Sequence, residues 1–581
     1  MPPLPLDPLQ DRSQPGSLGL QGMRPYPHGG MSRPADRPLR TLLLLGAIGL
    51  GAWLRLRGLG EVPLYGDEHH GLRLAAEPIS DIVREFDGYG THVMLPLLQR
   101  MAMRLLDSTI VAFRMPALLP GLLCLVLCYP AARAFVGPGP ALVATMALAT
   151  SPIHVYYTRF ARAYSLMILL GLLLVWAVRK AHRDEWRARG GLLAVGAVAA
   201  LLPYTHLSSA GFTATVGLVA VGLAWRCYGA RTALRPLAVF ACAAGVAVLL
   251  FLPVREPLMD YLGRHAVGEE DRPTGLLGIA ALLAGGGYAG IVAGALLLGG
   301  LVGLLARRFT DGSLLGAPIL GSAAFLGLTL PHGMEYAYAR YLIVALPAAL
   351  IVCSWALFAP FEGWVPGRWA TRLGLGTGLA LVTVGFLTGP LAAREPDPGS
   401  LSNTYLALRD LPAFDRPWPA TPKVYARIAA DPQARRIIEA PELPTRAVLL
   451  YRNYALQHGK DVLIGLDRGR DEEHPRGPFV PLDRPDLGRA SGARYLVLHR
   501  DPQVELMAYW KWVYKEVWPE LRNPWDHGLM SRLRRSYIPE YDMKVQATDL
   551  EKHLRASLGA PFYVDEKVAV WRLRPQQDEG R

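Results

Sequence analysis

The sequence predicts a polytopic α-helical membrane protein of about eleven spanning helices, followed by a soluble α/β domain. Three observations support this fold class. Of the 581 residues 51% are hydrophobic and only 19% are charged. The charged residues avoid long runs of Leu, Ala, Val and Gly, and the composition becomes that of a soluble protein after residue 391. We therefore expect a tail (1–40), a membrane domain (41–391) and a C-terminal domain (392–581).

The first forty residues are rich in Pro, Gly and Arg. They lack the short apolar region and the small-residue cleavage site of a signal peptide. This composition predicts a disordered cytoplasmic tail.

Spanning helices are predicted wherever roughly 20 largely apolar residues occur together. Such windows lie near 41–57, 112–132, 138–157, 161–179, 190–207, 210–227, 236–254, 286–306, 314–331, 340–359 and 373–391. The apolar stretch 274–306 is too long for one span. Its GGG at 285–287 predicts a short interfacial piece before the span itself.

The orientation follows from the positions of Lys and Arg. They collect in the loops 179–189, 226–235 and 306–308, which are therefore expected in the cytoplasm. With eleven spans, alternation places the N-terminus in the cytoplasm, and it places the loop 58–111 and everything after 391 outside. These basic loops explain the net charge of +13 better than nucleic-acid binding, because no basic-aromatic stripe accompanies them. An exported domain and this charge bias are typical of a bacterial inner-membrane protein.

The C-terminal region alternates strand and helix patterns. RRIIEAP, TRAVLLYRNYALQHG and KDVLIG are typical of a strand, a helix and a strand, and ARYLVLHRD indicates another buried strand. HLRASLG then predicts a helix, and FYVDE and VAVWRL predict strands. The region contains no glycine-rich phosphate loop that would identify a ligand.

The loop between the first two spans is long and contains its own helical patterns, GLRLAAEPISDIVREF and HVMLPLLQRMAMRLLD. Near its start, GDEHH places Asp67, Glu68, His69 and His70 close to the external membrane face. As a structural alternative, Asp67 caps a helix that begins at Glu68. A divalent metal held by Glu68 with His69 or His70 is a weaker alternative, because consecutive residues seldom converge on one ion and no HExxH or CxxC pattern supports them.

Arginines recur on the external side, against the usual charge bias. SPIHVYYTRFARAYSL (151–166) places Arg159 and Arg162 three residues apart, on one face of the expected helix. HGMEYAYARYLIVALP (332–347) adds Arg340 at the start of the tenth span. Arginine binds phosphate oxygens in a bidentate manner, so these positions favour a clamp for a lipid phosphate. Snorkelling toward lipid headgroups is the alternative.

These residues are the basis of a family resemblance. GDEHH after the first span, THVMLPLLQ later in that loop, FRMPALLPGLL, SPIHVYYTRFARAYSL and RYLIVALP occur in this order along residues 40–391. In this region the chain resembles the GT-C fold glycosyltransferases, in particular the dolichyl-phosphate-mannose protein mannosyltransferase superfamily (glycosyltransferase family 39-like), which includes the aminoarabinose transferases.

The resemblance implies transfer of a sugar from a polyprenyl-phosphate donor to an envelope acceptor (protein, lipid or polysaccharide) on the outer face of the membrane. It maps the catalytic base onto Asp67, with Glu68 as its neighbour. No cofactor is required, and a divalent metal remains the alternative. Two departures concern the acceptor side. Relatives often have a Glu within the motif at 158–162, and they often read His-Pro-Pro where this chain has His92 followed by Val-Met-Leu-Pro.

The expected chemistry needs few groups. A phosphate is a good leaving group that needs no strong general acid, so one carboxylate facing the acceptor and cations facing the phosphate suffice. Asp67 opposite Arg162 and Arg340 would provide both, and a single displacement would invert the anomeric centre. The other substrate-binding candidates are Arg159, Tyr164, Tyr338, Tyr341 and His92, although tyrosines at a membrane interface and isolated histidines such as His92, His206 and His332 also have structural roles.

Two other function classes remain open at this stage. A transporter or flippase for lipid-linked sugars would also have many spans, but it usually shows repeated halves and charges at mid-membrane, which this sequence lacks. A catalytically silent envelope scaffold is the second alternative. The gathering of the ionisable candidates on one membrane face favours the enzyme.

Overall fold

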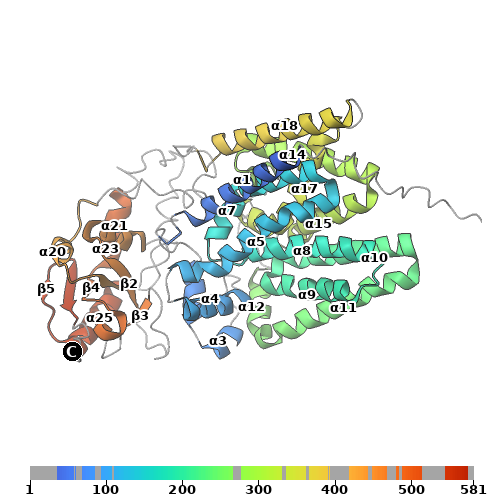
Figure 1. Cartoon of the computed structure of the whole chain (residues 1–581). Helices are drawn as coiled ribbons and strands as arrows, with labels where there is room; N and C mark the ends of the chain where they lie inside the picture. Colours follow the sequence, from blue (N-terminus) through green and yellow to red (C-terminus); the bar gives the residue numbers. More distant parts are fainter. Residues whose placement is uncertain are drawn as a thin grey trace, which may run out of the picture.

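The computed structural model describes residues 36–57, 59–60, 68–76, 78–84, 93–106, 110–265, 276–329, 335–361, 365–389, 391–392, 418–441, 448–466, 479–482, 487–512 and 543–573. Figure 1 shows long helices running alongside one another in one bundle, with the C-terminal α/β domain beside one end of it. We call this end of the bundle the site end. The predicted fold class, a helical membrane protein with a C-terminal α/β domain, is confirmed.

Within the described ranges, nine helical segments are long and apolar enough to cross a membrane. They correspond to α1 (Asp36–Leu56), α5 (Ile110–Val136), α8 (Tyr164–Arg183), α10 (Ala210–Tyr228), α11 (Ala230–Phe251), α14 (Gly287–Arg307), α15 (Phe309–Thr329), α17 (Leu346–Phe358) and α18 (Gly367–Thr388). The other two of the eleven predicted windows form shorter apolar helices, α6 (Pro138–Ala149) and α9 (Arg189–Thr205), so nine of the eleven have the length of a full span. The first stops where Ser151 caps the next helix, and the second stops where His206 becomes extended.

The glycine run at 285–287 breaks the chain where the sequence predicts it. A short helix, α13 (Leu276–Ala284), precedes α14 and packs against it. Gly285 between them has a φ of 91°, a left-handed conformation that glycine adopts without a steric penalty. The close approach also needs a glycine on α14, since a Cβ at Gly290 would lie 2.6 Å from the backbone nitrogen of Ala281.

Short helices from separate loops gather at the site end. The first loop supplies α2 (Glu68–Ala76), α3 (Ile79–Arg84) and α4 (Met94–Leu105), close to the two helical patterns expected there. Later segments add α7 (Pro152–Arg159), the 3₁₀ turn η1 (Leu207–Ser209), α12 (Arg255–His265) and α16 (Glu335–Leu342). In Figure 1, α3, α4, α7 and α12 lie toward the C-terminal domain.

The C-terminal domain is built on a six-stranded sheet of order β3-β2-β1-β4-β6-β5. The strands β1 (Arg436–Ala440), β2 (Asp461–Leu466), β3 (Phe479–Pro481) and β4 (Tyr495–His499) are parallel, whereas β6 (Val568–Arg572) runs antiparallel to β4 and to β5 (Tyr563–Val564). The strands predicted from RRIIEAP, KDVLIG, ARYLVLHRD, FYVDE and VAVWRL are all present. The short strand β3 was not predicted.

Helices cover both faces of this sheet. α20 (Val424–Ala430), α21 (Val448–His458) and α23 (Pro502–Trp512) share one apolar cluster with Val497 of β4. α22 (Leu487–Ser491) and α25 (Met543–Leu558) share another cluster with Leu496 and Leu498. All five residues of β4 are buried, as expected for a strand covered on both faces.

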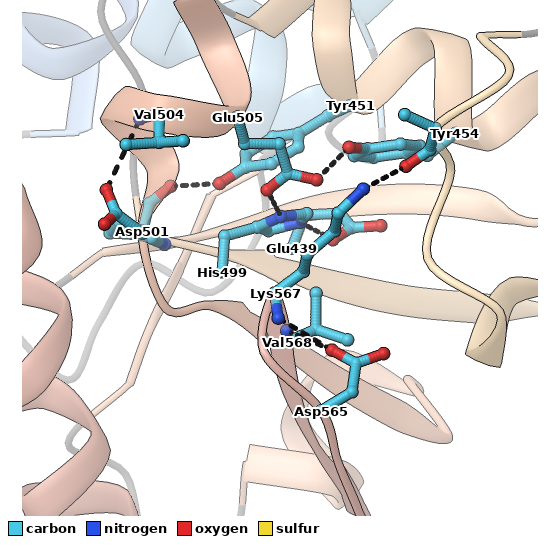
Figure 2. Close-up of polar contacts among 12 residues, drawn as sticks. Glu439, Tyr451, Tyr454, His499, Asp501, Val504, Glu505, Asp565, Lys567 and Val568 are labelled. Atoms are coloured by element: carbon cyan, nitrogen blue, oxygen red, sulfur yellow. Dashed lines mark hydrogen bonds and ion pairs between the residues drawn. The ribbon is translucent and has the colours of Figure 1, made fainter. Parts of the chain in front are cut away.

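A charged cluster lies inside the first of these cores. The ring of His499 is fully buried, with Nδ1 2.6 Å from Glu505 Oε2 and Nε2 3.0 Å from Glu439 Oε2 (Figure 2). Tyr425 donates a 2.8 Å hydrogen bond to Glu439, and Tyr454 donates a short one to Glu505. Burial lowers the pKa of His499, but the two carboxylates outweigh it and raise it to about 10. An imidazolium therefore joins β1, β4 and α23 at neutral pH.

This cluster predicts a pH-dependent stability. The unfolded His499 has a pKa of about 6.5 and the folded one about 10, so its stabilisation is complete below pH ~6.5 and is lost as the pH rises through ~10. We expect the C-terminal domain to unfold at a lower temperature at pH 9 than at pH 7, by roughly 5 °C or more. Proteolysis of the full chain during heating would measure this.

A matched pair of variants identifies the source of the effect. His499→Phe should remove most of the difference between pH 7 and pH 9, whereas His553→Phe, at an exposed site on α25, should retain it. An equal pH dependence in the wild type and the His499→Phe variant would contradict the assignment.

Candidate active site

Glu68 is fully buried and connects three segments at the site end. Arg114 of α5 donates from Nε to Oε1 at 2.8 Å and from Nη2 to Oε2 at 2.7 Å, a bidentate ion pair. The remaining nitrogen of the guanidinium, Nη1, donates to the Leu59 carbonyl at 2.8 Å. The backbone N–H of Ala161 donates to Glu68 Oε1, also at 2.8 Å. Both carboxylate oxygens are thus engaged in holding the fold.

Ala161 is held from a second side as well. Its carbonyl accepts a 3.1 Å hydrogen bond from Nε2 of Gln99, which is fully buried on α4. The close packing includes Gly71 on α2, where a Cβ would lie 3.4 Å from Gln99 Oε1 and 3.5 Å from the ring of Phe113. Side chains from α2 and α4 therefore fix the backbone of the turn at 160–161, between Arg159 and Arg162.

This turn corrects one prediction from the sequence. Arg159 and Arg162 were expected on one face of a continuous helix, but α7 ends at Arg159 and Phe160 is extended, with φ −97° and ψ 123°. The helix stops because the N–H of Ala161 bonds to Glu68 instead of to a carbonyl one turn back. The two arginines consequently flank the turn instead of forming a helical pair.

Both arginines of the turn lie inside the protein. Arg159 is 7% exposed and Arg162 is 5% exposed, so neither extends along the lipid-facing surface as the snorkelling alternative requires. Arg159 Nη1 lies 3.4 Å from the carbonyl of Leu54, at the end of α1. Burying cations is costly unless polar or anionic groups surround them.

An aromatic row leads from the turn to Arg340. Ring centroids of neighbouring members lie 4.4–6.3 Å apart, within the range of favourable aromatic contacts. At the far end, Arg340 Nη2 donates a 3.0 Å hydrogen bond to the Tyr341 hydroxyl, and its guanidinium lies over the Tyr341 ring. The row consists, in order, of Phe160, Tyr157, Tyr164, His206 and Tyr341.

The structure brings together part of the predicted site. Glu68 contacts the turn between Arg159 and Arg162, and Tyr164 is linked through His206 to Tyr341 and Arg340. Tyr338 lies in the same apolar cluster as Tyr164, but no ring contact joins it to the aromatic row among the described residues. Asp67 and His92 lie outside the described residues, as do the side chains of His69 and His70.

A metal site does not emerge from the part of the chain that the structure describes. No group of three or more His, Cys, Asp or Glu side chains there could hold an ion. Glu68, the described member of the weak metal alternative, already accepts three hydrogen bonds.

Three residues of this arrangement were not identified from the sequence as part of the site. Arg114 was visible as a charge at the start of an apolar span, a signal of a functional or paired position. Gln99 was visible as a polar residue within the amphipathic pattern of α4. His206 was noted only as an isolated histidine, and its role depends on contacts between segments far apart in the sequence.

Comparison with known proteins supports a family assignment. Residues 92–255 match the family described as dolichyl-phosphate-mannose-protein mannosyltransferase. No curated protein matches the chain. Among solved structures, ArnT from Cupriavidus metallidurans is similar at 14% identity. Its apo structure has a TM-score of 0.49 and covers 81% of this chain and 95% of that one. Its structure bound to undecaprenyl phosphate also has a TM-score of 0.49 and covers 82% of this chain and 95% of that one. The oligosaccharyltransferase of Archaeoglobus fulgidus has a TM-score of 0.42 at 11% identity, covering 84% of this chain and 73% of that one.

The matched segment 92–255 includes α4, the helix α5 with Arg114, and the turn between Arg159 and Arg162. The resemblance predicted from the sequence is therefore confirmed for this segment, which matches the family described as dolichyl-phosphate-mannose-protein mannosyltransferase.

Proposed function

We propose that the protein transfers a sugar from a polyprenyl-phosphate donor to an acceptor at the membrane face formed by the site end. The observation that carries this proposal is the buried Glu68–Arg114 ion pair, which holds the turn between two buried arginines. A lipid phosphate is the anion expected at a membrane surface beside such cations. The family description, which names a lipid-phosphate sugar, supports the same donor class.

The proposed reaction is a single displacement at the anomeric carbon. The acceptor oxygen or nitrogen attacks this carbon and gives its proton to Asp67, the residue directly before Glu68. The bond from the anomeric carbon to the phosphate oxygen breaks, and its electron pair leaves on the polyprenyl phosphate. Arg162 and Arg340 would stabilise the charge that develops on that phosphate. The product would have the inverted configuration at the anomeric carbon. The reaction as written needs no metal.

Within this proposal Glu68 has a positioning role. Its carboxylate accepts hydrogen bonds from Arg114 and Ala161, which leaves it badly placed to take a proton from an acceptor. It would instead fix the start of α2 against the arginine turn. Asp67, one residue earlier in the chain, would thereby be kept at a constant place relative to the phosphate.

The proposed location is the bacterial inner membrane, with the N-terminus in the cytoplasm and the site end and C-terminal domain outside. The basic ends of α8 and α10, at Arg183 and Arg226, support this orientation. The acceptor is a protein, a lipid or a polysaccharide of the envelope.

Asp67→Asn tests the base. Because asparagine cannot accept the proton, turnover should fall by about 10²–10⁴-fold, while binding of the polyprenyl-phosphate donor stays near the wild-type level. Single-turnover assays with a polyprenyl-phosphate sugar would measure turnover and donor binding. Mass spectrometry of envelope glycans would measure the product. Wild-type turnover in the Asp67→Asn enzyme would exclude this residue as the base.

Arg114→Gln tests the positioning role of the ion pair. It leaves the buried Glu68 carboxylate without its cation, which typically costs about 3–5 kcal/mol of stability. In molecules that remain folded, we expect weaker donor binding as well as slower turnover, because the arginine turn loses its support.

Arg133→Gln is the matched control, since Arg133 lies exposed near the other end of the same helix. It should behave like the wild type in thermal melting, donor binding and turnover. Normal donor binding in a folded Arg114→Gln protein would contradict the proposed support of the turn.

A further inference from the structure

A groove separate from the arginine turn opens at the site end, between α3 and the segment 252–257, which follows α11 and includes the start of α12. Its volume is about 730 Å³. Two arginines, Arg84 and Arg255, are the only cations among its lining residues, and Glu256 is the only anion. The other lining residues are Ser80, Val83, Leu252, Pro253 and Pro257.

A packed apolar cluster adjoins the lining of this groove. Ile82 and Val254, which neighbour lining residues in the chain, form a buried cluster with Val93, and Tyr204 and Phe251 pack against it. The rings of Tyr204 and Phe251 meet edge to face at 5.5 Å. The lining thus combines charged and apolar side chains, and it adjoins packed apolar residues.

The position of Arg255 along its helix places the groove at the membrane surface. The candidate span runs from Ala230 to Asp260, 31 residues, which is longer than the roughly 20 residues that cross the hydrocarbon core. Arg235 and Arg255 are separated by about 30 Å at ~1.5 Å per residue, close to the thickness of that core. Arg235 therefore marks one interface, and Arg255 lies at the level of the headgroups on the other.

The surface beside the groove faces lipid. Only 11% of the most apolar window of this span is buried within the protein. Val248, Leu249 and Leu252 are 61%, 63% and 50% exposed. A ligand bound in the groove would thus contact cationic side chains at one end and the exposed apolar surface of α11 at the other.

We propose that this groove binds an anionic phospholipid of the surrounding membrane. Its phosphate would lie between Arg84 and Arg255, and its acyl chains would follow the exposed face of α11. The ion pair between Arg255 Nη2 and Glu256 Oε1 is long, at 3.5 Å, and both side chains are exposed, so a phosphate can compete with it. The lipid would fasten α3 of the first loop to the segment 252–257. This inference is independent of the donor site and of the proposed transfer reaction.

The test uses the full chain in phosphatidylcholine nanodiscs that contain a photoreactive phosphatidylglycerol. Labelled peptides are then quantified by mass spectrometry. We expect labelling of residues 79–84 and 252–259, with a loss of roughly fivefold for each arginine in Arg84→Gln and Arg255→Gln. Glu256→Gln should increase labelling, because it removes the competing carboxylate. The double Lys variant, Arg84→Lys with Arg255→Lys, should retain most of it and reports on folding.

Arg231→Gln is the control, since Arg231 lies exposed at the opposite end of α11 and should leave labelling of these two peptides unchanged. Equal labelling in the wild type and the double Gln variant would overturn the proposal. An equally strong loss in Arg231→Gln would also overturn it. Displacement by inorganic phosphate beyond that by chloride at equal ionic strength would assign the groove to a free anion instead of a lipid.

Discussion

The membrane part of this protein depends on the buried ion pair between Glu68 and Arg114. A buried carboxylate is costly unless a cation and hydrogen-bond donors surround it, and here the guanidinium fork and the Ala161 N–H supply three contacts. Because these donors come from α5 and from the turn after α7, the ion pair fixes two distant segments against the first loop. The end of α7 and the location of the two arginines follow from this arrangement.

Other buried charged side chains of the bundle are likewise satisfied by hydrogen bonds or ion pairs. Arg55, fully buried near the end of α1, donates to the carbonyls of Leu148 and Ala149 and lies 2.6 Å from His154 Nδ1. It thereby connects α1 with the junction of α6 and α7. At the opposite end of the bundle, Arg179 pairs with Asp311 at 2.8 Å, which joins α8 to α15. Each pair satisfies groups that could not remain unpaired in a lipid environment.

Much of the fold was predictable because its signals are local. The apolar windows predicted the spans, and the glycine run at 285–287 predicted the break before α14. The helix start at Glu68 and five of the six strands were also predictable from pattern alone. Helix ends were less predictable: α7 stops at Arg159 because a side chain 93 residues earlier accepts the N–H of Ala161, and no local pattern contains that information.

The difference between local and long-range signals also explains which residues of the site could be predicted. Glu68 and Arg162 were identifiable by charge in an apolar context, but the partner of Glu68 was not, because Arg114 resembles any arginine at the start of a span. The place of His206 in the site depends on its ring contacts with Tyr164 of α8 and Tyr341 of α16. The charged cluster around His499 was likewise not predicted, since Glu439, His499 and Glu505 lie in three separate elements.

The central claim is that the Glu68–Arg114 ion pair holds Arg162 in position for a lipid phosphate. A double-mutant cycle on polyprenyl-phosphate binding, with Arg114→Gln, Arg162→Gln and the double variant, tests this most directly. If the ion pair acts through the turn, the loss caused by Arg162→Gln should largely disappear in the Arg114→Gln background, with a coupling energy of about 1–2 kcal/mol. Losses that simply add in the double variant would contradict the account.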